Sequence, residues 1–198
     1  RFLYTYCLMA AEFQVEKKKL KTPPLEIHTL GDRVLRQPAK RVAKVDDELR
    51  LVAQAMLKTM YSSDGIGLAA PQVAIHKQLI VVDIEPDNAA NQPLILINPK
   101  VIRSSRELCT GQEGCLSIPG VYLDVIRPAA IEVSYKDEHG RPQKLRASEL
   151  LARAIQHEMD HLTGVMFVDR VDNAIALNQA LQKQGFSARD VRAVRANK

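Results

Sequence analysis

Apolar positions in the first third of the chain follow the period of a helix. Four of them recur at steps of three or four residues: Leu49, Val52, Met56 and Met60. Asp46 or Asp47 can cap this helix, and the polar residues 62–65 can end it. We therefore expect a helix here, with its two methionines in the core.

Short apolar runs in the middle of the chain predict strands. Residues 79–82 and 94–97 are continuous apolar stretches bounded by turn-forming residues. Ile131 and Val133 alternate with polar neighbours, and residues 137–140 then form a turn. Because hairpin-length turns outnumber longer crossovers, we expect antiparallel pairing.

Two more helices are expected toward the C-terminus. Ser148 can begin the first, and Gly164 is placed to end it. The second covers about residues 172–183. Strands in the middle with helices on either side indicate an α+β fold.

Length and charge suggest one domain with a segment at each end. The 198 residues suffice for a real core, and 46% hydrophobic and 26% charged residues are ordinary for a globular protein. No apolar stretch reaches the roughly 18 residues needed to span a bilayer. The net charge of +5 is concentrated at the ends. We therefore expect an N-terminal extension (1–24), a central domain (25–186) and a basic C-terminal tail (187–198).

The strongest chemical signal is the sequence from His157 to His161, which reads His-Glu-Met-Asp-His. On a helix the two histidines lie on one face with Cβ atoms roughly 6 Å apart, so both rings can bind one cation. Glu158 lies close enough to reach a water on that metal. Histidine pairs with this spacing also occur by chance, but the accompanying Glu and the capped helix favour a metal site.

The third ligand is expected upstream of this helix. A catalytic metal usually has three protein ligands and one open position. After His161 the chain has no His, Cys or Glu, and Phe167 stands where one class of peptidases has its third histidine. Cys115 lies upstream in the tightly turned Glu-Gly-Cys-Leu-Ser segment, whereas we interpret Cys109 as structural. A thiolate beside two imidazoles favours Fe²⁺, Zn²⁺, Co²⁺ or Ni²⁺ over Mg²⁺ or Ca²⁺.

The cysteine count indicates a reducing compartment. The chain has three cysteines, and an odd number in a domain of this size does not suggest a framework of disulfides. We therefore expect free thiols.

A third segment, residues 65–72, reads Gly-Ile-Gly-Leu-Ala-Ala-Pro-Gln. Two glycines among small residues let a backbone approach another group closely. The segment lacks the Lys-Ser/Thr of a phosphate-binding loop, and a simple helix stop would explain only its glycines. Gln72 is a neutral amide donor, which suits the stabilisation of an oxyanion without competition for the metal.

These three segments, in this order, resemble the signature of the peptide deformylases. The family pattern comprises a G-x-G-L-A-A-x-Q loop, an E-G-C-L-S segment and Q-H-E-x-D-H-L, and the similarity covers about residues 25–171. The resemblance implies a metal-dependent hydrolase that removes the N-formyl group from the N-terminal methionine of new polypeptides and releases formate. It also implies antiparallel sheets packed around the helix that carries the H-E-x-x-H motif.

The resemblance further implies roles for individual residues. Cys115, His157 and His161 would hold one divalent metal, natively Fe²⁺, which Zn²⁺, Ni²⁺ or Co²⁺ could replace. Glu158 would be the general base, and Gln72 with the backbone N–H of Leu116 would form the oxyanion site. The residues that would bind the substrate are Gly65, Ile66, Gly67 and Gly114.

One position departs from the common pattern. Many bacterial members carry Arg seven residues after the metal cysteine, and here that residue is Tyr122. In this respect the chain resembles the plastid-type branch, so the role of the Arg is not transferred to Tyr122.

Two other functions share part of these features. A zinc endopeptidase also has the two-histidine helix, but its third ligand would have to follow that helix. A nucleic-acid-associated protein with a structural metal would have a closed fourth position and no role for Glu158.

The basic tail suggests a partner. Its four cations recur every three residues after Ser187: Arg189, Arg192, Arg195 and Lys198. On a helix they would form a cationic stripe able to dock transiently on ribosomal RNA through phosphate contacts, without reading bases. The alternative is a solvated tail. We expect no membrane binding, and a location in the bacterial cytoplasm, or in the plastid stroma if residues 1–24 derive from a leader.

Overall fold

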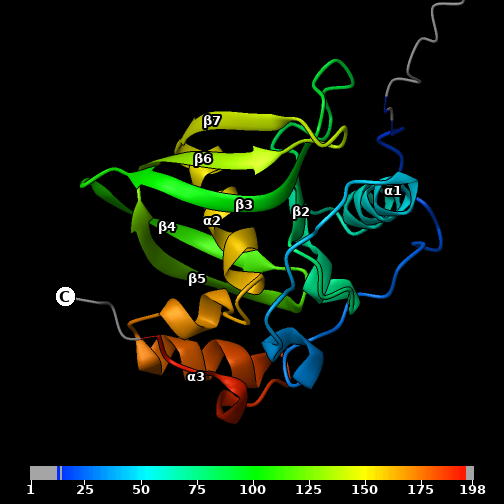
Figure 1. The fold of residues 1–198 in the computed structure, drawn as a ribbon. Helices are drawn as coiled ribbons and strands as arrows, with labels where there is room; N and C mark the ends of the chain where they lie inside the picture. Colours follow the sequence, from blue (N-terminus) through cyan, green and yellow to red (C-terminus); the bar gives the residue numbers. More distant parts are fainter. Residues whose placement is uncertain (1–12, 14, 195–198) are drawn as a thin grey trace, which may run out of the picture.

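The computed structural model describes residue 13 and residues 15–194, so Cys7 and the last two basic residues of the tail lie outside the described part. Two antiparallel sheets enclose a central helix, which confirms the expected α+β architecture (Figure 1). The larger sheet has the strand order β1-β2-β3-β6-β7, and the smaller one pairs β4 with β5. No helix among the described residues combines the length and apolar character needed to cross a membrane.

Helix α1 (Asp47–Ser62) forms where the apolar period predicted it. Asp46 is its N-cap, and the Asp46 side chain accepts a hydrogen bond from the backbone N–H of Leu49. Met56 and Met60 are fully buried, as expected. Asp64, at φ 56°, then turns the chain out of the helix.

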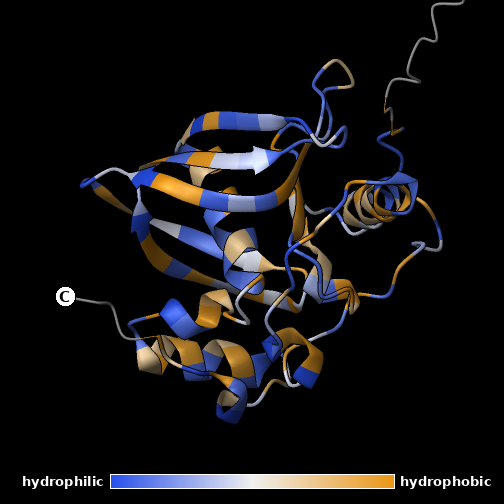
Figure 2. Cartoon of the chain, viewed as in Figure 1, coloured by the Kyte–Doolittle hydropathy of each residue, from blue (hydrophilic) through white to orange (hydrophobic). Residues whose placement is uncertain are grey.

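The strands of the larger sheet are β1 (Gly67–Ala69), β2 (Leu79–Val82), β3 (Leu94–Ser104), β6 (Ala130–Lys136) and β7 (Pro142–Ser148). Strand β2 is apolar throughout because both of its faces are covered. Leu79 and Val81 pack with α1, whereas Ile80 and Val82 face the central helix α2 (Glu149–His161). The first residues of β3 are likewise covered on both faces, since Ile95 and Ile97 pack with α1 and Leu96 packs with α2. Strands β6 and β7 are banded in Figure 2, because apolar and polar side chains alternate along them.

The smaller sheet is a long two-stranded ribbon of β4 (Leu108–Cys115) and β5 (Ile118–Pro128), joined by a turn at Leu116 and Ser117. The tight turn expected around Cys115 is therefore present, whereas the two strands that flank it were not predicted. The inner face of β5 packs on Phe167 of the 3₁₀ helix η3 (Phe167–Arg170) and on α3 (Ala174–Lys183). Figure 1 shows α3 below β5 and α2 between the two sheets.

Helix α2 begins and ends where expected. Ser148 occupies the N-cap position, yet its side chain makes no capping hydrogen bond. Gly164 has φ +75°, and a Cβ there would lie 2.7 Å from the Arg36 carbonyl oxygen. Gly164 is therefore required both by its backbone conformation and by this close contact.

Both terminal segments contact the central domain. The Lys17 ammonium lies 2.6 Å from the buried Asp83 carboxylate and donates to the backbone carbonyls of Glu85 and Asn88. In the tail, the described part forms only the 3₁₀ helix η4 (Ala188–Asp190) and not the helix that the spacing of its cations suggested. We infer that the structural unit includes parts of segments 1–24 and 187–198.

The tail is held at a buried ion pair. The Arg36 Nη1 lies 2.5 Å from the Asp169 Oδ2, and the Arg36 guanidinium also donates to the carbonyl oxygen of Asp190. The backbone N–H groups of Arg192 and Val194 donate to Asp169. The backbone of the tail is therefore attached to the core, while the Arg189 and Arg192 side chains are exposed.

Candidate metal centre and substrate cleft

The fold brings together the three residues proposed as metal ligands. Cys115 ends β4, while His157 and His161 lie one turn apart on α2. One potential ligand atom from each residue lies within 4.8 Å of the others. The Cys115 Sγ is 3.4 Å from the His161 Nε2, and the two imidazole centroids are 5.1 Å apart.

The donor atoms fit a divalent cation. The His157 Nδ1 donates to Glu113 at 3.0 Å, which leaves its Nε2 for a metal. Burial and the neighbouring His157 hold the pKa of His161 well below its usual range, so His161 is neutral, as a metal ligand must be. Burial opposes a charge on His157, but hydrogen bonds to Cys115 and Glu113 raise its pKa well above the usual value. The Cys115 and Glu113 side chains, which stabilise a proton on His157, would also stabilise a metal cation bound at this place.

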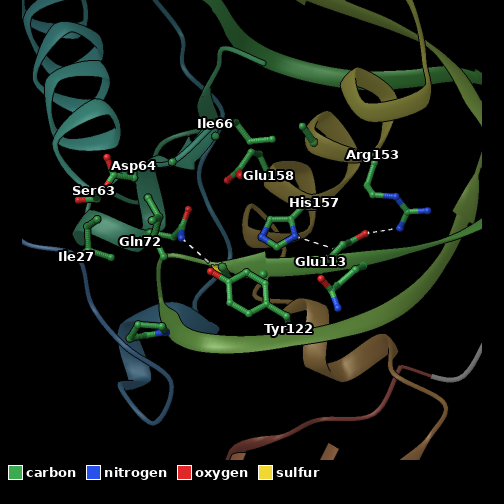
Figure 3. Close-up of a pocket in the computed structure, with 18 of the residues that line it drawn as sticks. Ile27, Ser63, Asp64, Ile66, Gln72, Glu113, Tyr122, Arg153, His157 and Glu158 are labelled. Carbon is green, nitrogen blue, oxygen red and sulfur yellow. Dashed lines mark hydrogen bonds and ion pairs between the residues drawn. The ribbon is translucent and has the colours of Figure 1, made fainter. Parts of the chain in front are cut away.

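Glu158 lies beside this cluster and is available for proton transfer. Its side chain is buried, and burial raises its pKa to about 7. Its Oε2 has no hydrogen-bond partner among the described residues. Figure 3 shows Glu158, His157 and Gln72 directed toward the same space. A buried carboxyl group with such a pKa can accept and return a proton near neutral pH.

Gly67 makes room for Glu158. A Cβ on Gly67 would overlap the Glu158 carboxylate, whereas a Cβ on Gly65 would meet the side chain of Leu116. The glycine-rich segment was expected to approach another group closely. Its backbone does so at two places, at the proposed general base Glu158 and at the turn after Cys115.

The Gln72 amide has a fixed orientation. Its Oε1 accepts from the Ala69 backbone N–H at 2.8 Å. Its Nε2 donates to the Ser117 Oγ at 3.1 Å and lies 3.4 Å from the Cys115 Sγ. The amide nitrogen, and not the oxygen, therefore faces the metal cluster, which is the orientation that an oxyanion donor needs.

A backbone bridge that sequence analysis missed connects the two loops of the site. The His28 N–H donates to the Gln72 carbonyl oxygen at 2.8 Å, and the Leu30 N–H donates to the Ser117 carbonyl oxygen at 2.9 Å. Residues 28–30 therefore hold the Gln72 loop and the Cys115 turn together. No side-chain pattern in the sequence indicated this role.

Glu113 is a second residue whose role was missed. Its carboxylate accepts from Arg127 at 2.6 Å and from Arg153 at 2.8 Å, in addition to His157. Burial alone would raise the pKa of Glu113, but the hydrogen bonds from Arg127 and His157 hold it well below its usual range. The available signal was an acidic residue two positions before Cys115.

A cavity of about 710 Å³ opens beside the cluster. It lies between the loop after α1 and the β4–β5 ribbon (Figure 3). Its lining includes every residue proposed for substrate binding: Gly65, Ile66, Gly67 and Gly114. Tyr122 also lines it, and its ring covers Gly114 so closely that a Cβ there would lie 2.5 Å from the ring.

Comparisons with known proteins agree with this geometry. The family model described as polypeptide deformylase matches residues 24–175. Peptide deformylase 1 of Nostoc sp. is 69% identical over 94% of this chain and 100% of its own length. The crystal structure of a peptide deformylase from Synechococcus elongatus, in complex with actinonin, is 66% identical with a TM-score of 0.90, covering 91% of this chain and 98% of that one.

A plant structure is more distant. Peptide deformylase 1B of Arabidopsis thaliana, in complex with an inhibitor, is 37% identical with a TM-score of 0.74, over 80% of this chain and 91% of that one. The family model matches most of the chain, and the relatives match it over nearly their full length. The chain therefore belongs to the peptide deformylase family, enzymes that remove the N-formyl group from new polypeptides.

Proposed function

We propose that this peptide deformylase hydrolyses formylmethionyl chains at the site formed by Cys115, His157 and His161, with Glu158 as general base. The observation that carries the proposal is the convergence of these three ligands beside a buried carboxyl group that has no hydrogen-bond partner in the described part of the chain. We assign Gln72 and the Leu116 N–H to the oxyanion site.

A divalent ion held by Cys115, His157 and His161 would supply Lewis acidity and lower the pKa of water. Glu158 accepts the proton of the attacking water, since its carboxylate lies beside the three ligands and its Oε2 has no hydrogen-bond partner among the described residues. It then returns the proton to the nitrogen of the leaving amine. The C–N bond breaks, and formate and a free N-terminus result.

The oxyanion that forms at the formyl carbon needs donors already in place. Gln72 meets this need because Ala69 and Ser117 fix its amide. One such donor is typically worth about 3–4 kcal/mol in the transition state. At Gly65, Gly67 and Gly114 the backbone lies so close to neighbouring side chains that an added Cβ would collide with them. The formyl carbon carries a hydrogen in place of a side chain, so we propose that a restricted space beside the cluster excludes ordinary peptide bonds.

We propose Fe²⁺ as the native ion, with Zn²⁺, Ni²⁺ or Co²⁺ as substitutes. One thiolate and two neutral imidazoles form a donor set of intermediate softness, which suits these ions better than Mg²⁺ or Ca²⁺. Metal analysis of protein purified without oxygen tests the assignment.

We also propose that the tail touches the ribosome transiently. The support is the exposure of the Arg189 and Arg192 side chains on a backbone that is attached to the core. Such contacts would use RNA phosphates and weaken steeply with salt. The proposed place of action is the bacterial cytoplasm, or the plastid stroma if residues 1–24 include a leader.

The decisive experiment measures formate release from a formyl-Met tripeptide by anaerobically metallated protein. Glu158→Gln should retain the metal and lose nearly all turnover, whereas Glu149→Gln, at the exposed start of the same helix, should match the wild type. Wild-type turnover in Glu158→Gln would refute the assigned base. Cleavage of an unformylated peptide instead would indicate an endopeptidase.

A further inference from the structure

The outer face of the β4–β5 ribbon exposes three large hydrophobic side chains. Leu108 is 61% exposed, Tyr122 62% and Ile126 50%. Residues directly opposite each other in an antiparallel pair lie on the same face, and so do residues two apart on one strand. Leu108 is opposite Pro128, and Tyr122 and Ile126 lie six and two residues before Pro128 on β5, so all three apolar side chains share one face. We call Leu108, Tyr122 and Ile126 the ribbon face.

The ribbon face is continuous with the substrate cleft. Tyr122 lines the cavity, together with Gln112 of β4 and the half-exposed Leu150 at the start of α2. Along β4 the cavity runs from Cys115, at the metal cluster, to Gln112. Leu108 and Ile126 lie further in the same direction, away from the metal.

We propose that the ribbon face binds the part of the newly made polypeptide that follows the residues in the cleft. Tyr122 and Ile126 are four residues apart on β5, which corresponds to about 13 Å along a strand, or about four residues of an extended chain. The inference rests on the proposed function, because it requires the formyl group at the metal cluster.

The chemistry of the face suits an unfolded chain. Its apolar residues are separated by polar ones, Thr110, Gln112 and Asp124. An extended polypeptide also presents its side chains alternately, and before folding its apolar residues are exposed. The face therefore favours apolar residues downstream of the formylmethionine. The other strongly exposed apolar residues, Leu51 and Ile175, lie on α1 and α3 and line no part of the cavity.

The test compares a formyl-Met tripeptide with two nine-residue formyl-Met peptides that share its first three residues. One carries Leu and Val beyond position three, and the other carries Ser and Gly. We expect kcat/KM for the apolar peptide to exceed the other two values about fivefold. The double variant Leu108→Ser/Ile126→Ser should remove this advantage and leave the tripeptide value unchanged.

The matched control is Leu51→Ser/Ile175→Ser, which should keep the advantage. Equal kcat/KM for all three peptides in the wild type, or an equal loss on all three in the ribbon variant, would overturn the proposal. Absence of tripeptide hydrolysis in the wild type would instead refute the proposed function.

A second measurement does not depend on a folded variant. A photoreactive side chain at position six of the apolar peptide should cross-link wild-type protein within residues 108–126. Cross-links confined to α1 or α3 would contradict the inference.

Discussion

Glu113 holds His157 through a 3.0 Å hydrogen bond to Nδ1, and two arginines fix Glu113 in turn. This contact sets the tautomer of His157 and leaves Nε2 for a metal. Arg127 also bridges to Asp160 at 2.9 Å, and Asp160 pairs with Arg170. Helix α2 and the β4–β5 ribbon are therefore joined by a network of charged side chains next to the candidate site.

We expect Glu113→Gln to weaken metal binding about 10- to 100-fold, because His157 loses its charged acceptor. Competition with a chelator measures the affinity. Glu107→Gln, at an exposed position just before β4, is the control and should bind metal like the wild type. Unchanged affinity in Glu113→Gln would show that the contact does not position His157.

Gly67→Ala should abolish most turnover, because its Cβ would displace the Glu158 carboxylate. Gly65→Ala should cost less, since its Cβ would meet the flexible end of the Leu116 side chain. Steady-state kinetics and metal content of the two variants test this order. The reverse order would mean that Glu158 does not need its present position.

Gln72→Ala should lower kcat about 100- to 1,000-fold while metal content stays constant. The exposed Gln92→Ala is the matched control. Ser117→Ala should have a smaller effect in the same direction, because it removes only one hydrogen-bond partner of the Gln72 amide. A drop in metal content that parallels the drop in kcat would argue against an oxyanion role.

Removal of residues 186–198 should destabilise the protein as well as weaken ribosome binding. The deletion takes away three hydrogen bonds of the Arg36–Asp169 pair: the Asp190 carbonyl oxygen accepts from Arg36, and the backbone N–H groups of Arg192 and Val194 donate to Asp169. Their loss should cost about 2–4 kcal/mol and lower Tm by about 5–10 °C. Arg189→Glu/Arg192→Glu should keep the wild-type Tm and lose only ribosome binding in a sedimentation assay. A truncated protein as stable as the wild type would contradict the structural role.

Asp137 should contribute to the loss of stability in acid. Burial alone would raise its pKa, but hydrogen bonds from Arg141, Gln143 and His139 lower it below the usual value. Its contribution is therefore complete above about pH 4, the pKa of the unfolded carboxyl group, and is lost as pH falls through the lower folded pKa. Asp137→Asn should flatten the acid limb of Tm against pH, and the exposed Asp87→Asn should not.

The local structure of the chain was largely predictable from its sequence. Helix α1 followed from the apolar period and the Asp46 cap, and α2 from Ser148 as its start and Gly164 as its end. The ordered segments around Gln72, Cys115 and His157 also indicated the family, because each carries its chemistry within a few neighbouring residues.

Tertiary structure decided what depends on distant partners. Glu113 as the support of His157 and residues 28–30 as a bridge between loops arise from contacts across more than forty residues of chain. The tail also could not be predicted from local sequence. The spacing of its cations suggested a helix, but hydrogen bonds to Asp169 hold its described backbone in a non-helical conformation after the short 3₁₀ helix η4. Periodicity reports only which side chains share a face, whereas hydrogen bonds between remote segments depend on how the whole chain packs.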